Sequence, residues 1–206
     1  MMKLKHALFS ICLTSLLSAC TLDMARPTHV KYISQEDPTW QQHLTQIQQI
    51  KQYSNQGQLG YISEKERFST RFEWQYQNPA NYKLHLSSSI SATTLTLEMR
   101  NQHLRIFDNK GNERQAKEAS HLLHAMIGVE FPLEKFALWL KGQPETQSHY
   151  KVGENHLLAS FDYSLPPNLW TVDYLSYHQQ ALPLPKDILI KTEGQTLKIR
   201  VDHWKY

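Results

Sequence analysis

Hydrophobic and polar side chains alternate one by one between Phe68 and Tyr76. Aromatic residues fill every second position of this stretch except Thr70, and polar residues such as Arg71 and Glu73 lie between them. Successive side chains of a β-strand point to opposite faces, so a period of two indicates an extended strand. We therefore predict a half-buried strand whose aromatic face is turned toward a core.

The same period recurs along much of the chain. Asp108–Gly111 and, near the C-terminus, Glu193-Gly194 have the composition of tight turns. The strands on either side of each turn are therefore expected to form a hairpin. The series indicates about nine to eleven strands, mostly in sequential antiparallel order. After residues 68–76 these strands are expected at residues 82–86, 95–99, 104–107, 112–116, 156–163, 170–177, 187–192 and 196–204.

A helical period precedes the strands. Asp37 can cap a helix that has Pro38 in its first turn, and apolar residues from Trp40 to Ile50 then recur at three- and four-residue steps. We predict an amphipathic helix that ends near Gly57.

Two shorter helices are expected in the middle of the chain. One covers residues 122–127 and stops at Gly128, and the other is opened by Pro132, turns Leu133 and Phe136 inward and stops at Gly142. Their narrow apolar stripes need a surface to cover. The predicted fold is mainly antiparallel β with a few helices, a curved sheet wrapped round them. Because three narrow stripes do not fill a concave sheet face, a hydrophobic cleft or cavity is the expected consequence.

The first twenty residues have the layout of an export signal. Lys3 and Lys5 precede a mostly apolar run that is about half the length of a membrane-spanning helix. The following Leu17-Ser18-Ala19-Cys20 resembles the lipobox of bacterial lipoproteins, which implies cleavage before Cys20 and its modification by S-diacylglycerol and N-acyl groups. Several acyl chains attach a protein stably to a bilayer. An ordinary cleaved signal peptide is the alternative.

This interpretation divides the chain into three parts. Residues 1–19 are the cleaved signal peptide, residues 20–37 a lipidated flexible tether, and residues 38–206 a single domain. Thr21 follows the cysteine, where an aspartate would resemble an inner-membrane retention signal, so the outer membrane is favoured.

Composition excludes several classes of function. Without Lys3 and Lys5 the mature chain has 20 basic against 19 acidic side chains, a balance that does not indicate nucleic-acid binding. Cys12 belongs to the signal and Cys20 carries the lipid, so the folded domain has no thiol for a disulfide or a nucleophile. No further cofactor is expected, and we expect a monomer.

Catalytic and metal-binding motifs are not evident. The sequence contains no Gly-x-Ser-x-Gly, His-Glu-x-x-His or phosphate-binding glycine motif. His121 and His124 would be neighbours on a helix, but no further ligands of suitable spacing accompany them, so no metal site is predicted. A hydrolase on a curved β scaffold stays open as an alternative, and so does a purely structural anchor protein with a filled core.

Ile90 is unusual because it is a bulky apolar residue in a serine-rich connection, residues 87–93. It either folds back onto the sheet or forms an exposed apolar finger that contacts lipid or a partner. The spacing of residues alone does not decide between these interpretations.

Several short motifs together resemble the LolB family of outer-membrane lipoprotein receptors. The resemblance runs from about Trp40 to the C-terminus and includes the positions of all five tryptophans. The motifs are residues 58–63 (QLGYIS), 71–74 (RFEW), 82–84 (YKL), 108–111 (DNKG) and 201–204 (VDHW).

The resemblance implies an unclosed antiparallel barrel with helices as a lid over an apolar cavity, and no catalytic residues. The implied role is to accept acylated lipoproteins from the periplasmic carrier LolA and to release them into the inner leaflet of the outer membrane without ATP. Ile90 matches the protruding apolar residue linked to membrane insertion in this family. Its flanking residues depart from the pattern, because Ser89 and Ser91 replace the usual proline and glycine.

A lipoprotein receptor needs an apolar cavity, because its cargo carries acyl chains that must be shielded from water. For each residue expected there, ordinary core packing is the alternative. We expect Phe72, Trp74, Leu84, Leu86, Leu95, Leu97, Phe136, Trp139, Leu140 and Trp170 to line or border the cavity.

Overall fold

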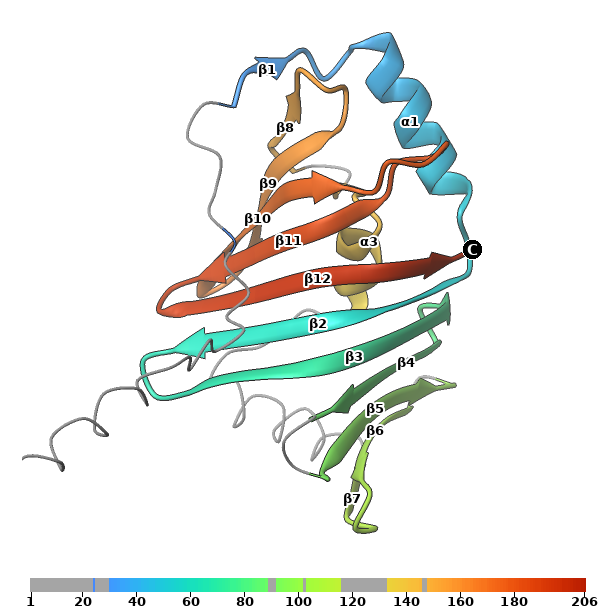
Figure 1. The fold of residues 1–206 in the computed structure, drawn as a ribbon, viewed down its shortest axis with the longest axis vertical. Coiled ribbons are helices and arrows are strands. Elements are labelled where there is room, and N and C mark those ends of the chain that lie inside the picture. Colours follow the sequence, from blue (N-terminus) through green and yellow to red (C-terminus); the bar gives the residue numbers. More distant parts are fainter. Residues whose placement is uncertain (1–23, 25–29, 89–91, 102, 116–132, 146–147) are drawn as a thin grey trace, which may run out of the picture.

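One curved, open antiparallel sheet forms the body of the protein (Figure 1). The computed structural model describes residues 24, 30–88, 92–101, 103–115, 133–145 and 148–206. Its 12 strands follow the order β1-β8-β9-β10-β11-β12-β2-β3-β4-β5-β6-β7, so β1 and β7 are the two edges. The strands are β1 (Tyr32–Ile33), β2 (Tyr53–Ser63), β3 (Arg67–Asn78), β4 (Asn81–Ser87), β5 (Thr94–Arg100), β6 (His103–Asp108), β7 (Glu113–Gln115), β8 (Tyr150–Gly153), β9 (Leu158–Leu165), β10 (Asn168–Tyr177), β11 (Pro185–Thr192) and β12 (Gln195–Lys205).

This arrangement confirms the predicted fold class, and each strand expected from the alternation is present. The sheet also contains β1, β2 and β8, which the alternation did not predict.

The first helix is shorter than predicted. Helix α1 (Pro38–Gln49) ends well before Gly57, and Ile50 is already extended with φ −71° and ψ 99°. Gly57 lies inside β2 instead, where a Cβ atom would be only 1.9 Å from the Arg200 carbonyl oxygen of β12. This glycine is therefore required by the close approach of two strands and does not terminate a helix.

The predicted start of α1 is confirmed. The Asp37 carboxylate accepts a hydrogen bond from the Trp40 backbone N–H at 2.8 Å, and Pro38 occupies the first turn. Trp40 and Ile47 are fully buried, so the predicted apolar stripe faces the core.

Ordered structure begins before residue 38, the expected start of the domain. Tyr32 and Ile33 of β1 pair with Gly153 and Val152 of β8, and the Glu154 N–H donates to the Lys31 carbonyl at 3.1 Å. The C-terminal part of the segment expected to be a flexible tether, residues 20–37, therefore contributes a strand to the sheet.

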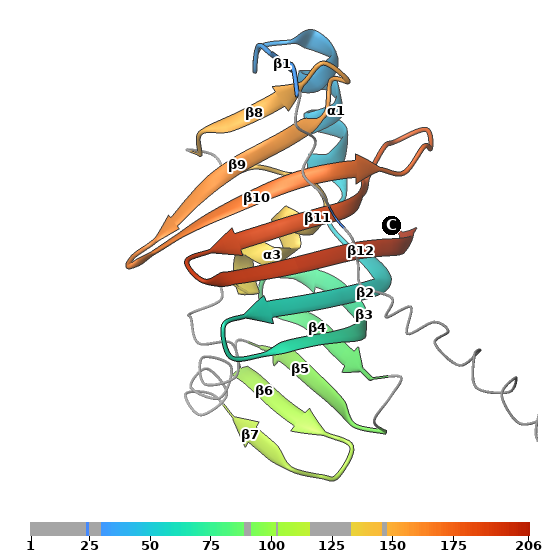
Figure 2. The same cartoon turned by 60° about the vertical axis from the view of Figure 1, so that its left-hand side comes forward.

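Helix α3 (Leu133–Leu140) lies on the concave face of the sheet (Figures 1 and 2). The Tyr53 hydroxyl donates to the Ala137 carbonyl at 2.6 Å, and the Tyr174 hydroxyl donates to the Trp139 carbonyl at 2.7 Å. Carbonyls in the last turn of a helix lack helical partners, so these two strands fix the C-terminal end of α3. Gly142, with φ +76°, follows the helix as predicted. The helix expected at residues 122–127 lies outside the described part of the chain.

Candidate functional site

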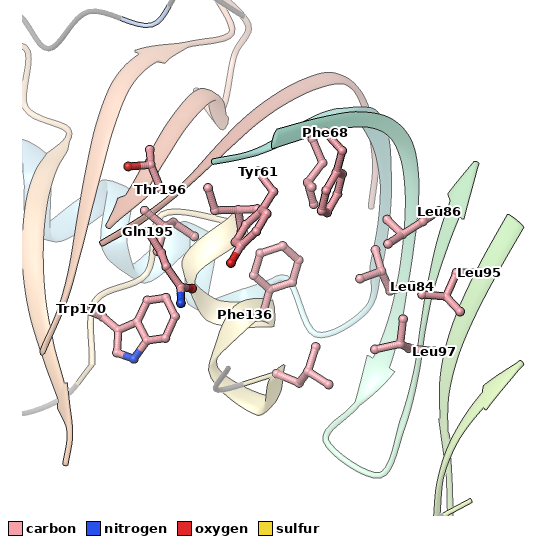
Figure 3. A pocket seen from close by; sticks show the side chains of 14 residues that line it. Tyr61, Phe68, Leu84, Leu86, Leu95, Leu97, Phe136, Trp170, Gln195 and Thr196 are labelled. Atoms are coloured by element: carbon pink, nitrogen blue, oxygen red, sulfur yellow. The ribbon is translucent and has the colours of Figure 1, made fainter. Parts of the chain in front are cut away.

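An apolar pocket of about 90 Å³ lies between α3 and the concave face of the sheet (Figure 3). Leucine pairs on two adjacent strands form one wall, because Leu84 is opposite Leu97 and Leu86 is opposite Leu95. Phe136 extends from α3 into the space between this wall and Trp170 of β10. The complete lining is Leu59, Tyr61, Phe68, Leu84, Leu86, Leu95, Leu97, Leu133, Phe136, Trp170, Ile190, Gln195, Thr196 and Leu197.

Strand register explains why these distant residues meet. In β4 and β5 the leucines fall on alternate positions of facing strands, so all four project from the same face. Tyr61 and Phe68 are likewise cross-strand partners in β2 and β3. Phe68 is 38% exposed and lies next to the β2–β3 turn, so the pocket reaches the edge of the sheet there.

Ten residues were expected to line or border the cavity, and the structure separates them into two groups. Six line the pocket: Leu84, Leu86, Leu95, Leu97, Phe136 and Trp170. The other four, Phe72, Trp74, Trp139 and Leu140, are fully buried in the core and are not part of the pocket lining.

Two of these core residues support the pocket from behind. The ring of Trp74 meets Phe136 at a centroid distance of 5.4 Å, and the ring of Trp139 lies 6.4 Å from Trp170. The Trp74 indole N–H also donates to the Tyr53 hydroxyl at 3.1 Å. Trp74 and Trp139 therefore hold the pocket side chains Phe136 and Trp170 in position.

The expected set did not include several lining residues. Leu59 and Tyr61 alternate within β2, a strand that was overlooked because the first helix was extended to Gly57. Phe68 and Leu133 were recognised as apolar positions in their elements but not assigned to a cavity. Thr196 and Leu197 belong to a strand that the alternation predicts, but the place of this strand, β12, beside β2 depends on the sheet order, and so does the place of Ile190 in the neighbouring β11. Gln195 precedes the predicted strand, residues 196–204.

The pocket offers little for catalysis. No carboxylate, imidazole or amine occurs among its described lining residues, and the Tyr61 phenol is the one titratable side chain among them. Such a lining disfavours a hydrolytic site, and the existence of a pocket disfavours a purely structural protein with a filled core.

None of the described ionisable groups with a shifted pKa lines the pocket. Burial raises the pKa of Tyr53 and Tyr174, the two residues that bind α3, well above the usual value of 10.0. Burial lowers the pKa of Lys141, just after α3, to about 8. These shifts follow from desolvation at structural contacts.

Three expectations concern residues outside the described part of the chain: the lipidation site Cys20, the insertion residue Ile90, and the His121–His124 pair. Among the described residues, no group of three or more His, Cys, Asp or Glu side chains could hold a metal ion. No described helix is long and apolar enough to span a membrane.

The fold and the site together define a class of protein, an open antiparallel half-barrel with an uncharged apolar pocket beneath a helix. A crystal structure of a LolA superfamily protein from Nitrosomonas europaea has the same fold, with a TM-score of 0.50 over 80% of this chain and 92% of that one, at 11% sequence identity.

Sequence relatives identify the family within that class. The family described as "Outer membrane lipoprotein LolB" matches residues 51–204. Proteins named outer-membrane lipoprotein LolB are 62% identical in Pasteurella multocida, across 100% of this chain and 99% of the relative, and 56% identical in Aggregatibacter actinomycetemcomitans, across 100% of both. A Haemophilus influenzae relative of the same name is 52% identical over 99% of this chain and 98% of its own length. The chain belongs to the LolB family and is a lipoprotein of the outer membrane.

Proposed function

We propose that this protein accepts lipoproteins from the periplasmic carrier LolA, binds their acyl chains in the pocket beside α3, and inserts them into the inner leaflet of the outer membrane without ATP. The observation that carries the proposal is the uncharged apolar lining on the concave face, combined with membership of a family of outer-membrane lipoproteins. That family concerns lipoprotein localisation and is not a family of enzymes.

The chemistry of the cargo explains the need for such a pocket. Each methylene transferred out of water contributes about 0.8 kcal/mol, so an acyl chain released into the periplasm faces a large free-energy cost. A wall of Leu84, Leu86, Leu95 and Leu97 provides aliphatic contacts for a chain of methylene groups. Dispersion and burial bind such a chain without directional bonds, so the pocket can accept lipoproteins of different sequence.

The pocket has to enlarge to hold a full acyl chain. It measures about 90 Å³, whereas an apolar cavity of about 150 Å³ is known to bind a molecule only as large as benzene. The first turn of α3 is the element best suited to move, because Leu133 and Phe136 border the pocket while the tyrosine contacts hold the C-terminal end of the helix.

Transfer without fuel follows from differences in affinity. The receptor must bind cargo more tightly than the carrier does, and the membrane must bind it more tightly still. A difference of about 1.4 kcal/mol shifts each partition tenfold. In this scheme Cys20, carrying its acyl and diacylglycerol groups, holds a monomeric receptor at the membrane, and Ile90 assists insertion.

A soluble form of the receptor tests the proposal. The chain is exported behind a conventional signal peptide with Cys20→Ala, purified, and mixed with LolA loaded with a radiolabelled lipoprotein in the absence of ATP. Pull-down of the receptor is expected to recover the label. Label that stays on the carrier at every receptor concentration would refute the receptor proposal.

A further inference from the structure

The antiparallel connections divide the sheet into two rims. The β9–β10, β11–β12 and β2–β3 connections lie on one rim, here called the turn rim. The chain ends at Tyr206 on the opposite rim (Figure 1). Tyr61, Phe68, Trp170 and Gln195 lie within a few residues of turn-rim connections, so the pocket is close to this rim.

The β9–β10 hairpin ends in an uncharged apolar tip, residues 165–169 (Leu-Pro-Pro-Asn-Leu), called the hairpin tip below. Leu165 pairs with Asn168, and Pro166 and Pro167 form the exposed turn between them. Leu169 is 59% exposed, the highest value among the large hydrophobic side chains of the described chain. The hairpin projects from the turn rim in the view of Figure 2.

Other described turns on this rim have a different chemistry. The β2–β3 turn contains Glu64, Lys65 and Glu66, and the β11–β12 turn contains Glu193. The hairpin tip has no charge, and the nearest charged residues along the chain are Asp162 and Asp173. Phe68, beside the charged β2–β3 turn, is 38% exposed, whereas Leu169 is 59% exposed in a tip without charge. An exposed apolar group of this kind is typical of a contact surface.

Two prolines suit this tip to a lipid environment. A backbone N–H that leaves water without a partner costs free energy, and proline has no N–H. Pro166 and Pro167 therefore bring no backbone N–H donor of their own into an apolar layer.

We propose that the hairpin tip is a membrane-contacting element, with Pro166, Pro167 and Leu169 inserted into the surface of the bilayer. The proposal rests on the outer-membrane location of the family and is independent of cargo transfer. The side chains of Leu169 and Trp170 point to opposite faces of β10, and Trp170 lines the pocket. Insertion of the tip therefore brings the pocket wall next to lipid.

Fluorescence quenching in the full acylated protein tests this contact. Leu169→Cys is labelled with a fluorophore, and the protein is reconstituted into phosphatidylethanolamine–phosphatidylglycerol vesicles that contain a nitroxide-bearing lipid. Tyr206→Cys is the matched control, because Tyr206 is 57% exposed and lies on the opposite rim. The parent protein, whose Cys20 thiol is expected to be blocked by its lipid, controls for labelling elsewhere.

The label at position 169 is expected to be quenched by the nitroxide lipid, and the label at position 206 is not. Equal quenching at both positions, or none at position 169, would overturn the proposal. Since no cargo or carrier is present, neither result bears on the receptor function, which is tested separately by transfer from LolA.

A second experiment removes the apolar contact by substitution of Leu169. In the soluble Cys20→Ala chain, Leu169→Glu is expected to weaken binding to the same vesicles roughly tenfold, whereas Tyr206→Glu leaves it unchanged. If Leu169→Glu keeps vesicle binding but slows transfer from LolA, the tip contacts the carrier and the membrane proposal is wrong.

Discussion

Trp74 of β3 and Phe136 of α3 meet edge to face, with ring centroids 5.4 Å apart and planes at 88°. Both side chains are essentially inaccessible to solvent, at 0% and 1% exposure, yet Phe136 also borders the pocket. Edge-to-face pairs are favourable beyond the burial of their surface. The contact therefore joins the stable core of the protein to the wall of its binding site.

Phe136→Ala is expected to lower the free energy of unfolding by about 3–5 kcal/mol, because it removes this ring pair and leaves a cavity. Urea denaturation measures the change. Phe68→Ala is the control, since Phe68 borders the same pocket but is 38% exposed, and it should cost much less. Equal losses in the two variants would show that Phe136 does not act as a core residue.

Leu86→Glu is expected to reduce binding of an acylated peptide at least tenfold, because a carboxylate in the pocket must be desolvated when an acyl chain enters. Leu86 is only partly buried, so the fold should tolerate the change. Displacement of a fluorescent fatty acid measures the affinity. Ser87→Glu places the same charge on the next residue of β4, facing away from the pocket, and should bind normally.

Lys141→Met is expected to destabilise the protein by about 1–3 kcal/mol. The Lys141 amine is buried and donates to the carbonyls of Ile47 and Ile50, at 3.2 Å and 3.0 Å, so it connects the end of α1 to the end of α3. Thermal and urea unfolding provide the measurement, with the exposed Lys51→Met as the control. An unchanged unfolding midpoint in Lys141→Met would contradict this role.

Acid sensitivity is expected from His43. Burial lowers the pKa of this histidine from 6.5 to about 4, so between these values the unfolded chain binds a proton that the folded protein does not. Stability should therefore fall as the pH drops from about 6.5 to 4, by at most about 1.4 kcal/mol per pH unit from this group. Urea unfolding across this range measures how the free energy of unfolding depends on pH. This dependence should be less steep in His43→Gln than in the parent protein. An equal slope in the variant would assign the acid sensitivity to other groups.

Alternation along the chain determined most of the sheet. Strands β3 to β6 and β9 to β12 were predicted because one face is apolar and the other polar, a local pattern that survives folding, and β7 was predicted from the turn composition of Asp108–Gly111 before it. Strand β2 was missed because its Gly57 was interpreted as the end of a helix, whereas the glycine is required by the Arg200 carbonyl, 143 residues away in the sequence. Strands β1 and β8 contain 2 and 4 residues, too few to show a period.

The binding site was predictable in kind but not in detail. Leu84, Leu86, Leu95 and Leu97 belong to consecutive strands, so hairpin register brings them together and the sequence is sufficient to pair them. Trp74 and Trp139 were expected there on equal grounds, because they are large and apolar, but they pack in the core. Whether an apolar side chain lines a space or fills it depends on which helix packs against it.

The sequence by itself determined the fold class, the hairpins and the resemblance to the LolB family, because these depend on short-range patterns and motifs. Only the tertiary structure decided that β12 lies between β11 and β2, that tyrosines from two strands hold the end of α3, and that an uncharged hairpin tip lies on the same rim as the pocket. These features arise from contacts between residues far apart in the chain, whose pairing is selected by packing of the whole domain and leaves no local period in the sequence.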